Sequence, residues 1–181
     1  MGILSDGDIK KEVSSGFLKI EPFKLECVQP ASYDVHLSDS ITNYAHPAGG
    51  AIPEGMLPEG VEVLSVLPPG GFALASTLET VHIPRYLACE LSGKSTIGRM
   101  GVQIHATAGW LDPGFQGQIT LELYNSSPQS FPLVEGMAIG QLVFHELKNP
   151  CTVGYGRRGH YQGQTGVTPP APFISLLETG A

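Results

Sequence analysis

Polar side chains that could perform chemistry gather in one part of the chain. They are Lys94, Ser95, Thr96, Arg99, Asp112 and Glu122. An ionised glutamate can take a proton from water as a general base, and lysine and arginine can bind anions. Each residue also suits a plain role, since Asp112 belongs to an Asp-Pro-Gly turn sequence and Glu122 fits a solvent-facing strand position. Any one of them alone is therefore a weak signal.

Residues 93–96 read GKST, the last four letters of a nucleotide-binding P-loop. That loop needs a further glycine five residues before Gly93, because its backbone curls around a phosphate, but position 88 is alanine. A P-loop lysine should also open a long helix, whereas Gly98 and Gly101 interrupt this stretch. The segment is therefore not a P-loop, and whether it binds a nucleotide depends on the other motifs.

Motifs for zinc binding and for serine hydrolysis are missing from the sequence. A zinc deaminase needs a His-x-Glu or Cys-x-Glu element and a downstream Pro-Cys-x-x-Cys, but Pro150 and Cys151 are not followed by the second cysteine. The six histidines lack zinc-ligand spacing, and there is no Gly-x-Ser-x-Gly elbow. We therefore expect neither a zinc site nor a serine hydrolase.

Length, composition and charge indicate one cytoplasmic domain. The 181 residues, 41% of them hydrophobic, suit a single domain over residues 1–181, and no apolar run is long enough to span a membrane. The first residues lack the pattern of a signal peptide, and the three cysteines are isolated, as in a reducing compartment. Because the net charge is −7, a broad nucleic-acid surface is not expected. We expect a cytoplasmic protein that binds neither membranes nor nucleic acids.

One helix is predicted near the N-terminus. Ser5 can cap it, Asp8 lies near its positive end, and Gly16 can end it. Ile9 and Val13 fall on one face of this helix. Beyond it the sequence reads as strands separated by turn-forming residues. The predicted strands are residues 72–81, 86–91, 102–107, 117–125 and 138–147.

Short strands at regular spacing, with 23 glycines and 15 prolines, predict a mainly β fold, either an antiparallel β-barrel or a β-sandwich. Residues 46–60 are expected to form a loop. The tail from about residue 154 is rich in glycine and proline and should be mobile unless something docks it.

Strand 117–125 is the element that should place Glu122. Side chains alternate between the two faces of a strand, so Ile119, Leu121 and Leu123 share one face. Glu122 then lies on the opposite face, away from these apolar side chains.

Five segments, in this order along the chain, resemble one protein family. They are PASYDVHL at 30–37, GKSTIGRMG at 93–101, HATAGWLDPGFQGQITLEL at 105–123, GMAIGQLVF at 136–144 and YQGQTG at 161–166. With the opening ILSDGDIKK, they closely resemble the dCTP deaminase family of the trimeric dUTPase superfamily, over nearly the whole chain. GKST then looks like the phosphate-contacting turn of that family, which binds a nucleotide without being a P-loop.

The resemblance implies a distorted antiparallel β-barrel that forms homotrimers, with each active site at a subunit interface. It implies dCTP as the substrate and magnesium bound to the triphosphate, without zinc. Relatives are inhibited by dTTP, and HATA at 105–108 matches the segment implicated in that response. The tail would close over the nucleotide and exclude water.

The resemblance also implies roles for single residues. Glu122 matches the catalytic glutamate, Ser95 would hydrogen-bond the attacking water, and Arg99 matches the arginine that supports the glutamate. The positions that match contacts to the substrate around its phosphates are Lys94, Ser95, Thr96, Ile97, Gly98 and Arg99. Further substrate contacts are matched by Asp112 under the deoxyribose, Thr120 and Leu121 beside the base, and Gln141, Tyr155 and Gln164.

Some positions differ from the usual pattern of the family. His160 stands where many relatives have a lysine, which puts one phosphate contact in doubt. Lys94 and Thr96 replace an arginine and a serine, and lysine cannot make the bidentate contact of arginine. Gly109 and Trp110 stand where members that release dUTP tend to carry a His-Arg pair. Members with Gly-Trp go on to split the triphosphate, so the resemblance implies dUMP as the product.

The implied reaction adds water at C4 of cytosine, protonates N3 and releases ammonia, with Glu122 moving the protons. Three alternatives stay open: a deaminase that releases dUTP, a dUTP pyrophosphatase in which water attacks phosphorus, and a non-catalytic nucleotide-binding trimer. Ammonia release from dCTP would distinguish a deaminase from the last two.

Overall fold

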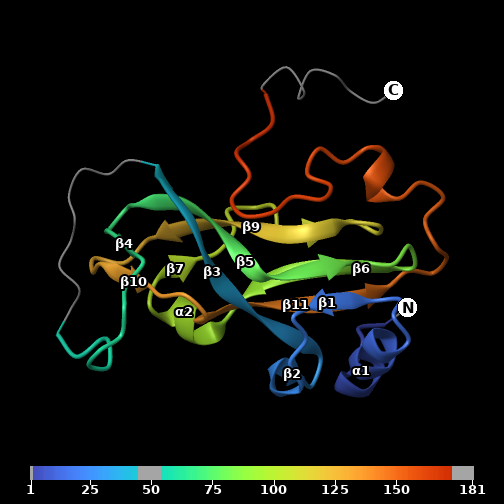
Figure 1. Cartoon of the computed structure of the whole chain (residues 1–181), viewed down its shortest axis with the longest axis horizontal. Helices are drawn as coiled ribbons and strands as arrows, with labels where there is room; N and C mark the ends of the chain where they lie inside the picture. Colours follow the sequence, from blue (N-terminus) through green and yellow to red (C-terminus); the bar gives the residue numbers. More distant parts are fainter. Residues whose placement is uncertain (1, 45–53, 173–181) are drawn as a thin grey trace.

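The structure, a computed structural model, describes residues 2–44 and 54–172. A curled antiparallel sheet forms most of it (Figure 1). The helical elements are α1 (Asp6–Ser14), η1 (Leu25–Cys27), α2 (Ser95–Arg99) and η2 (Tyr155–Arg157), where η marks a 3₁₀ turn. The strands are β1 (Lys19–Glu21), β2 (Val28–Gln29), β3 (Ser32–Tyr44), β4 (Ser65–Leu67), β5 (Phe72–His82), β6 (Leu87–Gly93), β7 (Val102–Gln103), β8 (Trp110–Leu111), β9 (Gln116–Asn125), β10 (Phe131–Leu133) and β11 (Ala138–Glu146).

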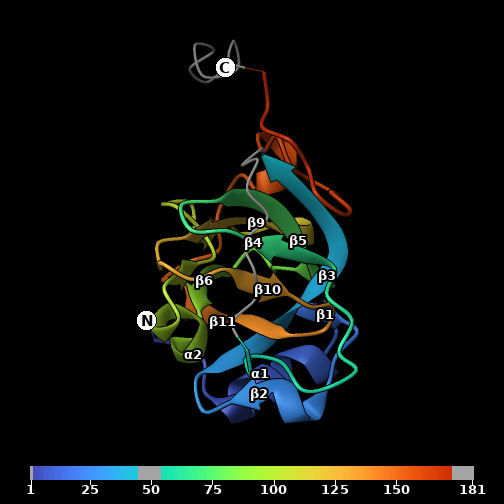
Figure 2. The same cartoon turned by 90° about the vertical axis from the view of Figure 1, so that its left-hand side faces the viewer.

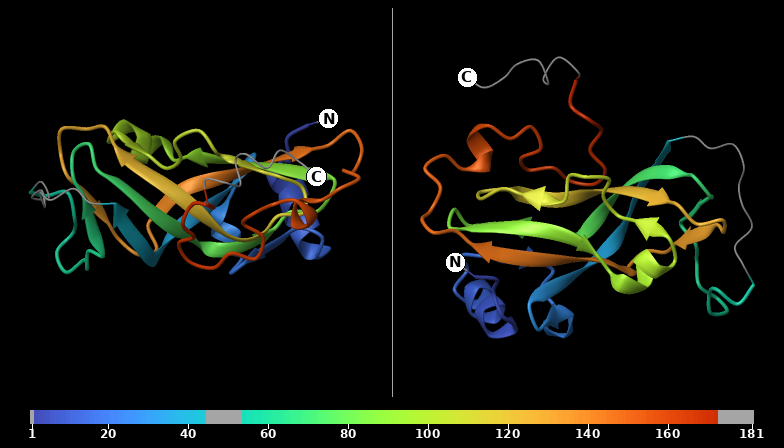
Figure 3. Two further views of the ribbon diagram at one scale, coloured as in Figure 1. Left: turned by 90° about the horizontal axis from the view of Figure 1, so that it is seen from above. Right: turned by 180° about the vertical axis from the view of Figure 1, so that it is seen from behind.

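The main sheet has nine strands in the described part of the chain. Its order is β7-β9-β5-β3-β11-β6-β8, with β1 paired to β5 and β2 paired to β3. Every pair is antiparallel, and β4 and β10 form a separate pair. The sheet curls on itself, as Figures 2 and 3 show, while β7 and β8 stand at its two open ends. The predicted mainly β, antiparallel barrel is confirmed in the form of an open half-barrel.

The pleat of β9 fixes the direction of Glu122. Ile119, Leu121 and Leu123 are buried in the hydrophobic core, whereas Glu122 lies on the other face and is only partly buried. Pairing with β5 sets this register, since Leu121 lies opposite Ala75. A slip by one residue would exchange the two faces and bury the carboxylate in the core. The predicted alternation of this strand is confirmed.

Helix α1 begins as its sequence predicts. The Ser5 hydroxyl accepts a hydrogen bond from the Asp8 backbone N–H at 3.3 Å, and the Asp8 carboxylate accepts one from the Ser5 N–H at 3.1 Å. This capping box satisfies N–H groups that have no partner within the helix. Ile9 is fully buried and Val13 packs on the core, and the helix ends just before Gly16, whose φ is 77°. In the described residues, no helix is long and apolar enough to cross a bilayer.

The predicted strands are confirmed in β5, β6, β9 and β11, but the strand at 102–107 was predicted too long. Only Val102 and Gln103 pair with β9. Beyond Ile104 the chain leaves the ladder, and the backbone N–H of Ala106 donates to the side chain of Glu122 instead. The segment after β7 thereby lies against the side chain of Glu122.

Several elements were missed in the sequence, among them β3 and α2. β3 pairs with β11 and β5 along its two edges, and its apolar Tyr33, Val35 and Leu37 alternate with polar residues, so a strand pattern was present in the sequence but was not recognised. α2 is a short helix that ends before Gly101, whose φ is 81°. Of the expected loop at 46–60, residues 46–53 lie outside the described residues, and residues 54–60 form turns and bends.

Candidate active site

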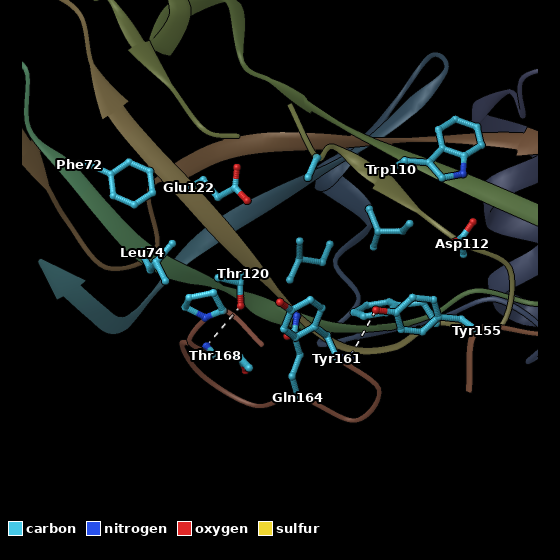
Figure 4. A pocket seen from close by; sticks show the side chains of 15 residues that line it. Phe72, Leu74, Trp110, Asp112, Thr120, Glu122, Tyr155, Tyr161, Gln164 and Thr168 are labelled. Carbon is cyan, nitrogen blue, oxygen red and sulfur yellow. Dashed lines mark hydrogen bonds between the residues drawn. The ribbon is translucent and has the colours of Figure 1, made fainter. Parts of the chain in front are cut away.

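Strands β5, β8 and β9 and the tail enclose a pocket of about 420 Å³ (Figure 4). Its lining residues are Phe72, Leu74, Ala108, Trp110, Leu111, Asp112, Phe115, Ile119, Thr120, Glu122, Tyr155, Tyr161, Gln164, Thr168 and Pro170. Most of these side chains are aromatic or aliphatic, and a few polar groups are set among them. This combination is typical of a site for a small organic ligand.

Glu122 supplies a carboxylate to this pocket. Its backbone N–H donates to the carbonyl of Ile104 at 2.9 Å, and its Oε2 accepts a hydrogen bond from the Ala106 N–H at 2.9 Å. The segment after β7 therefore orients the carboxylate through one oxygen. A carboxylate on the wall of a pocket can act as a general base when a proton of the bound ligand or water comes within hydrogen-bonding reach.

The Asp-Pro-Gly turn lies between β8 and β9 and meets the tail. The Phe115 N–H donates to the Asp112 carbonyl at 3.1 Å, and the Tyr155 N–H donates to the Pro113 carbonyl at 2.8 Å. The ring of Tyr155 packs edge-on to that of Phe115, with ring centroids 5.5 Å apart. Burial raises the pKa of Tyr155, and the negative charge of Asp112 raises it further, so the phenol stays neutral and keeps its hydrogen-bonding proton.

The tail docks along the first half of β9 by hydrogen bonds. The Gln118 N–H donates to the Gln164 carbonyl at 3.0 Å, and the Gln164 side-chain amide donates to the Gln118 carbonyl at 2.7 Å. The Thr168 N–H donates to the Thr120 hydroxyl at 3.4 Å. The tail thereby brings Gln164 to the pocket. Its mobility stays a prediction, and residues 173–181 lie outside the described residues.

The predicted phosphate turn lies elsewhere in the same chain. Lys94 precedes α2, and Ser95, Thr96 and Arg99 are exposed on that helix, which lies well away from the tail in Figures 1 and 2. None of these residues lines the pocket of Glu122 within the described part of the chain. Arg99 instead lines a separate cleft of about 360 Å³.

The remaining members of the predicted phosphate turn, Ile97 and Gly98, differ in exposure. The side chain of Ile97 is buried in the core, which anchors the turn. Gly98 is exposed, and its N–H donates to the Lys94 carbonyl at 3.0 Å.

The structure places the other predicted residues in different surroundings. Gln141 lies on β11 outside the pocket, and its Oε1 accepts a hydrogen bond from the Ser32 hydroxyl at 3.3 Å. The side chain of Leu121 is fully buried in the core, so it cannot contact a base. Trp110 is half-exposed at the pocket, and its ring is tilted by 41° to that of His145, with the ring centroids 5.4 Å apart. His160 is exposed, beside Tyr161.

Gly109 lies in a place that accepts no side chain. A Cβ atom added there would lie 2.7 Å from the Leu91 carbonyl oxygen and 3.0 Å from the His105 ring. The same backbone joins β6, because the Leu91 N–H donates to the Gly109 carbonyl at 2.6 Å. Glycine is therefore required for β8 to approach β6 and present Trp110.

One copy of the chain brings together only part of the predicted site. The residues that meet in the pocket are Asp112, Thr120, Glu122, Tyr155, Gln164 and Trp110. Tyr161 and Thr168 were not predicted, although Tyr161 opens the YQGQTG motif. Phe72, Leu74 and Phe115 also line the pocket, but apolar strand and turn residues carry no signal that distinguishes a pocket wall from a core.

The described residues contain no group of three or more histidine, cysteine, aspartate or glutamate side chains arranged to hold a metal ion. Asp112 and Glu122 line the same pocket without a third such ligand among its lining residues.

Comparison with known proteins places these features in a family. The family model described as dCTP deaminase-like matches residues 3–147. The chain belongs to the dCTP deaminase-like family. A dUMP-forming dCTP deaminase of Bifidobacterium longum is 44% identical over 181 residues, which covers 92% of each chain. Another of that name, from Thermobifida fusca, is 40% identical and covers 98% of this chain and 96% of its own.

Solved structures with a fold similar to that of this chain include a dCTP deaminase and a dUTPase. The crystal structure of a 2'-deoxycytidine 5'-triphosphate deaminase from Agrobacterium tumefaciens matches 80% of this chain with a TM-score of 0.61 and 22% identity. This chain spans about half of that protein, which is covered over 49% of its length. A mutant dUTPase from a Staphylococcus aureus phage, solved with a structural magnesium ion, matches 75% of this chain and 94% of its own, with a TM-score of 0.50 and 17% identity.

We expect Gly117→Ala to release the tail from β9. The φ of Gly117 is 145°, and an added Cβ atom would lie 2.8 Å from the Gln164 carbonyl oxygen. Hydrogen exchange at Gln118 and Gly166, whose N–H groups are bonded between tail and strand, should become at least about tenfold faster.

Gly163→Ala is the matched control for this prediction. Gly163 also has a positive φ, of 74°, but no atom lies within 4 Å of its added Cβ. Unchanged exchange in Gly117→Ala, or equal acceleration in both variants, would contradict the proposed close approach.

Proposed function

We propose that this protein is an enzyme that deaminates dCTP and forms dUMP. The observation that carries the proposal is Glu122, a partly buried carboxylate on the wall of a mainly aromatic and aliphatic pocket. Membership of the dCTP deaminase-like family supports it, as do curated relatives named dUMP-forming dCTP deaminases.

Glu122 is proposed to move the protons of the deamination. It takes a proton from water as the oxygen adds to C4 of cytosine, and it delivers that proton to N3. A second proton transfer to the amino group lets ammonia leave and leaves a uracil ring. A second water then cleaves the bond between the α- and β-phosphates. Together, dCTP and two waters give dUMP, ammonia and pyrophosphate.

The other pocket residues are proposed to bind the nucleoside. Asp112 would lie under the deoxyribose, and Thr120 with the Leu121 backbone would meet the base. Tyr155 and Gln164 would contact the nucleotide from the tail. The docking of that tail on β9 supports this arrangement, because it brings both side chains to the wall that holds Glu122.

The remaining residues are proposed to come from a second copy of the chain. Lys94, Ser95 and Arg99 do not line the pocket of Glu122 in one copy, yet the proposed reaction needs cations for a triphosphate. A homotrimer with each site at a subunit interface supplies them. The open edges of β7 and β8 and the half-exposed Trp110 favour assembly, since unpaired edges and apolar surface are commonly covered.

Magnesium is proposed to bind through the phosphate oxygens of the substrate. Lys94 and Arg99 are cations, which can hold phosphate but cannot ligate a metal, and the pocket offers two carboxylates without a third ligand. This donor set suits an ion that keeps water and phosphate ligands. When bound, magnesium would offset charge on the triphosphate.

Formation of dUMP is supported by Gly109 and Trp110 as well as by the names of the relatives. Any side chain at position 109 would strike β6, so a His-Arg pair would not fit this backbone without a shift. Trp110 lines the pocket beside Asp112, where a second water would have to be admitted. The effects of His160, and of dTTP through residues 105–108, stay predictions.

The purified protein with magnesium should convert dCTP to ammonia, dUMP and pyrophosphate. Early products separated by chromatography should contain dUMP and pyrophosphate in equal amounts, with little free dUTP. Accumulation of dUTP would indicate a deaminase without the second step. Turnover of dUTP without ammonia release from dCTP would instead identify a dUTP pyrophosphatase.

Glu122→Gln should lower kcat at least about 100-fold, because the amide keeps the shape of the carboxylate but cannot accept the proton. Binding of dCTP, measured by calorimetry, should change little. Glu135→Gln, in an exposed turn, is the control and should retain the full rate. More than a tenth of the wild-type rate in Glu122→Gln would show that another group is the base.

Mixing Glu122→Gln with Arg99→Gln should restore activity that neither variant has alone. If Glu122 and Arg99 act across an interface, each mixed trimer has one intact site, and random 1:1 assembly gives about a quarter of the wild-type rate. The chains are unfolded together and refolded, with each variant refolded alone as the control. Failure to regain activity in mixtures that contain mixed trimers would place both residues in one subunit.

A further inference from the structure

The PASYDVHL segment supplies polar residues to a row that crosses the sheet. Asp34 of β3 lies opposite Gln141 of β11, and Gln141 lies opposite Ser92 of β6. Tyr33 and Val35, the neighbours of Asp34, belong to the hydrophobic core. The row therefore lies on the face of the sheet away from that core, close to the start of α2.

Asp34 makes a short, largely buried ion pair with Lys94. The distance from Lys94 Nζ to Asp34 Oδ2 is 2.6 Å, and the same oxygen accepts a hydrogen bond from the Gln29 side chain at 3.1 Å. The Asp34 side chain is 12% exposed and that of Lys94 is 27% exposed. Asp34 Oδ1 is buried without a hydrogen-bond partner in the described residues, so Lys94 provides the main compensation for this charge.

Lys94 stays able to bind a ligand in this geometry. An ammonium group has three donor protons, and Asp34 Oδ2 accepts one of them. The lysine side chain would otherwise lose rotamer entropy on binding a phosphate. The pair with Asp34 removes most of that freedom beforehand, so the carboxylate helps binding through geometry although it reduces the local positive charge.

A second contact of the same segment acts on Gln141. The Ser32 hydroxyl donates to Gln141 Oε1 at 3.3 Å, which leaves the amide NH₂ of Gln141 as the group available to a ligand. Lys94 and Gln141 thus both present donors. Phosphate oxygens at neutral pH accept hydrogen bonds, so donors are what a polyphosphate requires.

We propose that Asp34 and Ser32 are positioning residues that hold Lys94 and Gln141 ready for the phosphates of dCTP. The proposal rests on the proposed function and assigns a role to the PASYDVHL segment, which contributes no side chain to the pocket of Glu122. Asp34 acts through Lys94, and Ser32 acts through Gln141.

The test is a double-mutant cycle on dCTP binding. Calorimetry with dCTP and magnesium is carried out in the Glu122→Gln background, where the substrate persists. Asp34→Asn should weaken binding about tenfold, within the range for coupled contacting groups. Lys94→Gln should weaken it at least as much, and Asp34→Asn should then have no further effect in the Lys94→Gln chain.

Asp39→Asn is the matched control, since Asp39 is an exposed residue of the same strand and should leave the affinity unchanged. If Asp34→Asn alone fails to fold, Asp34→Glu takes its place: it keeps the charge but moves the carboxylate by one methylene, and it should also weaken binding in the chain that retains Lys94. The double variant of Asp34→Asn and Lys94→Gln leaves no unpaired charge, and it should bind dCTP as Lys94→Gln does.

The outcomes distinguish this proposal from the proposed function. Unchanged or tighter binding in Asp34→Asn, or a loss that adds fully to that of Lys94→Gln, would overturn the positioning role alone. If the Glu122→Gln chain binds no dCTP and the wild-type chain turns none over, both proposals are wrong.

Discussion

Strand β9 has to serve two surfaces at once, because its side chains alternate. One face supplies Leu121 and Leu123 to the core, and the other supplies Thr120 and Glu122 to the pocket. The register with β5 makes the alternation rigid, since burial of the leucines and exposure of the carboxylate depend on the same pairing. A side chain held in this way loses little freedom when it acts, which is what a general base requires.

The chain is acidic overall, yet its proposed ligand is a triphosphate. The structure separates the two kinds of charge: Asp112 and Glu122 lie in the pocket, whereas Lys94 and Arg99 lie at α2. Within one copy, the carboxylate of Glu122 forms no ion pair with a cationic side chain in the part of the chain that the structure describes. In the proposed homotrimer, the complete charge pattern would form only at the interfaces between copies, and activity would then depend on assembly.

Local patterns in the sequence predicted those parts of the fold that depend on local physics. The cap at Ser5 and the alternation of β9 were both visible, because each involves residues a few positions apart. The family resemblance, not the pattern, indicated roles for Glu122 and Asp112, which otherwise suit ordinary surface positions. β3 was not predicted, although Tyr33, Val35 and Leu37 alternate with polar residues; Lys94 and Glu79, which pair with Asp34 and His36 on its other face, are distant in the sequence.

Long-range contacts were invisible in the sequence for a simple reason. The pair of Asp34 and Lys94 joins residues 60 positions apart, and the bonds of Gln164 with Gln118 join residues 46 apart. No spacing rule connects such residues, since their proximity is a product of the completed sheet. The Ala106 contact that ended the predicted strand at 102–107 is of the same kind.

The docked tail has a kinetic consequence for a reaction with two steps. Its hydrogen bonds cover β9 beside Thr120, so a nucleotide bound in this pocket, as proposed, would leave after a local opening of the tail. After deamination, the intermediate dUTP is partitioned between escape and cleavage according to the rates of opening and of attack by the second water. A tail held by backbone as well as side-chain bonds would slow the escape, and the commitment of dUTP to cleavage would then depend on groups that take no part in the chemistry.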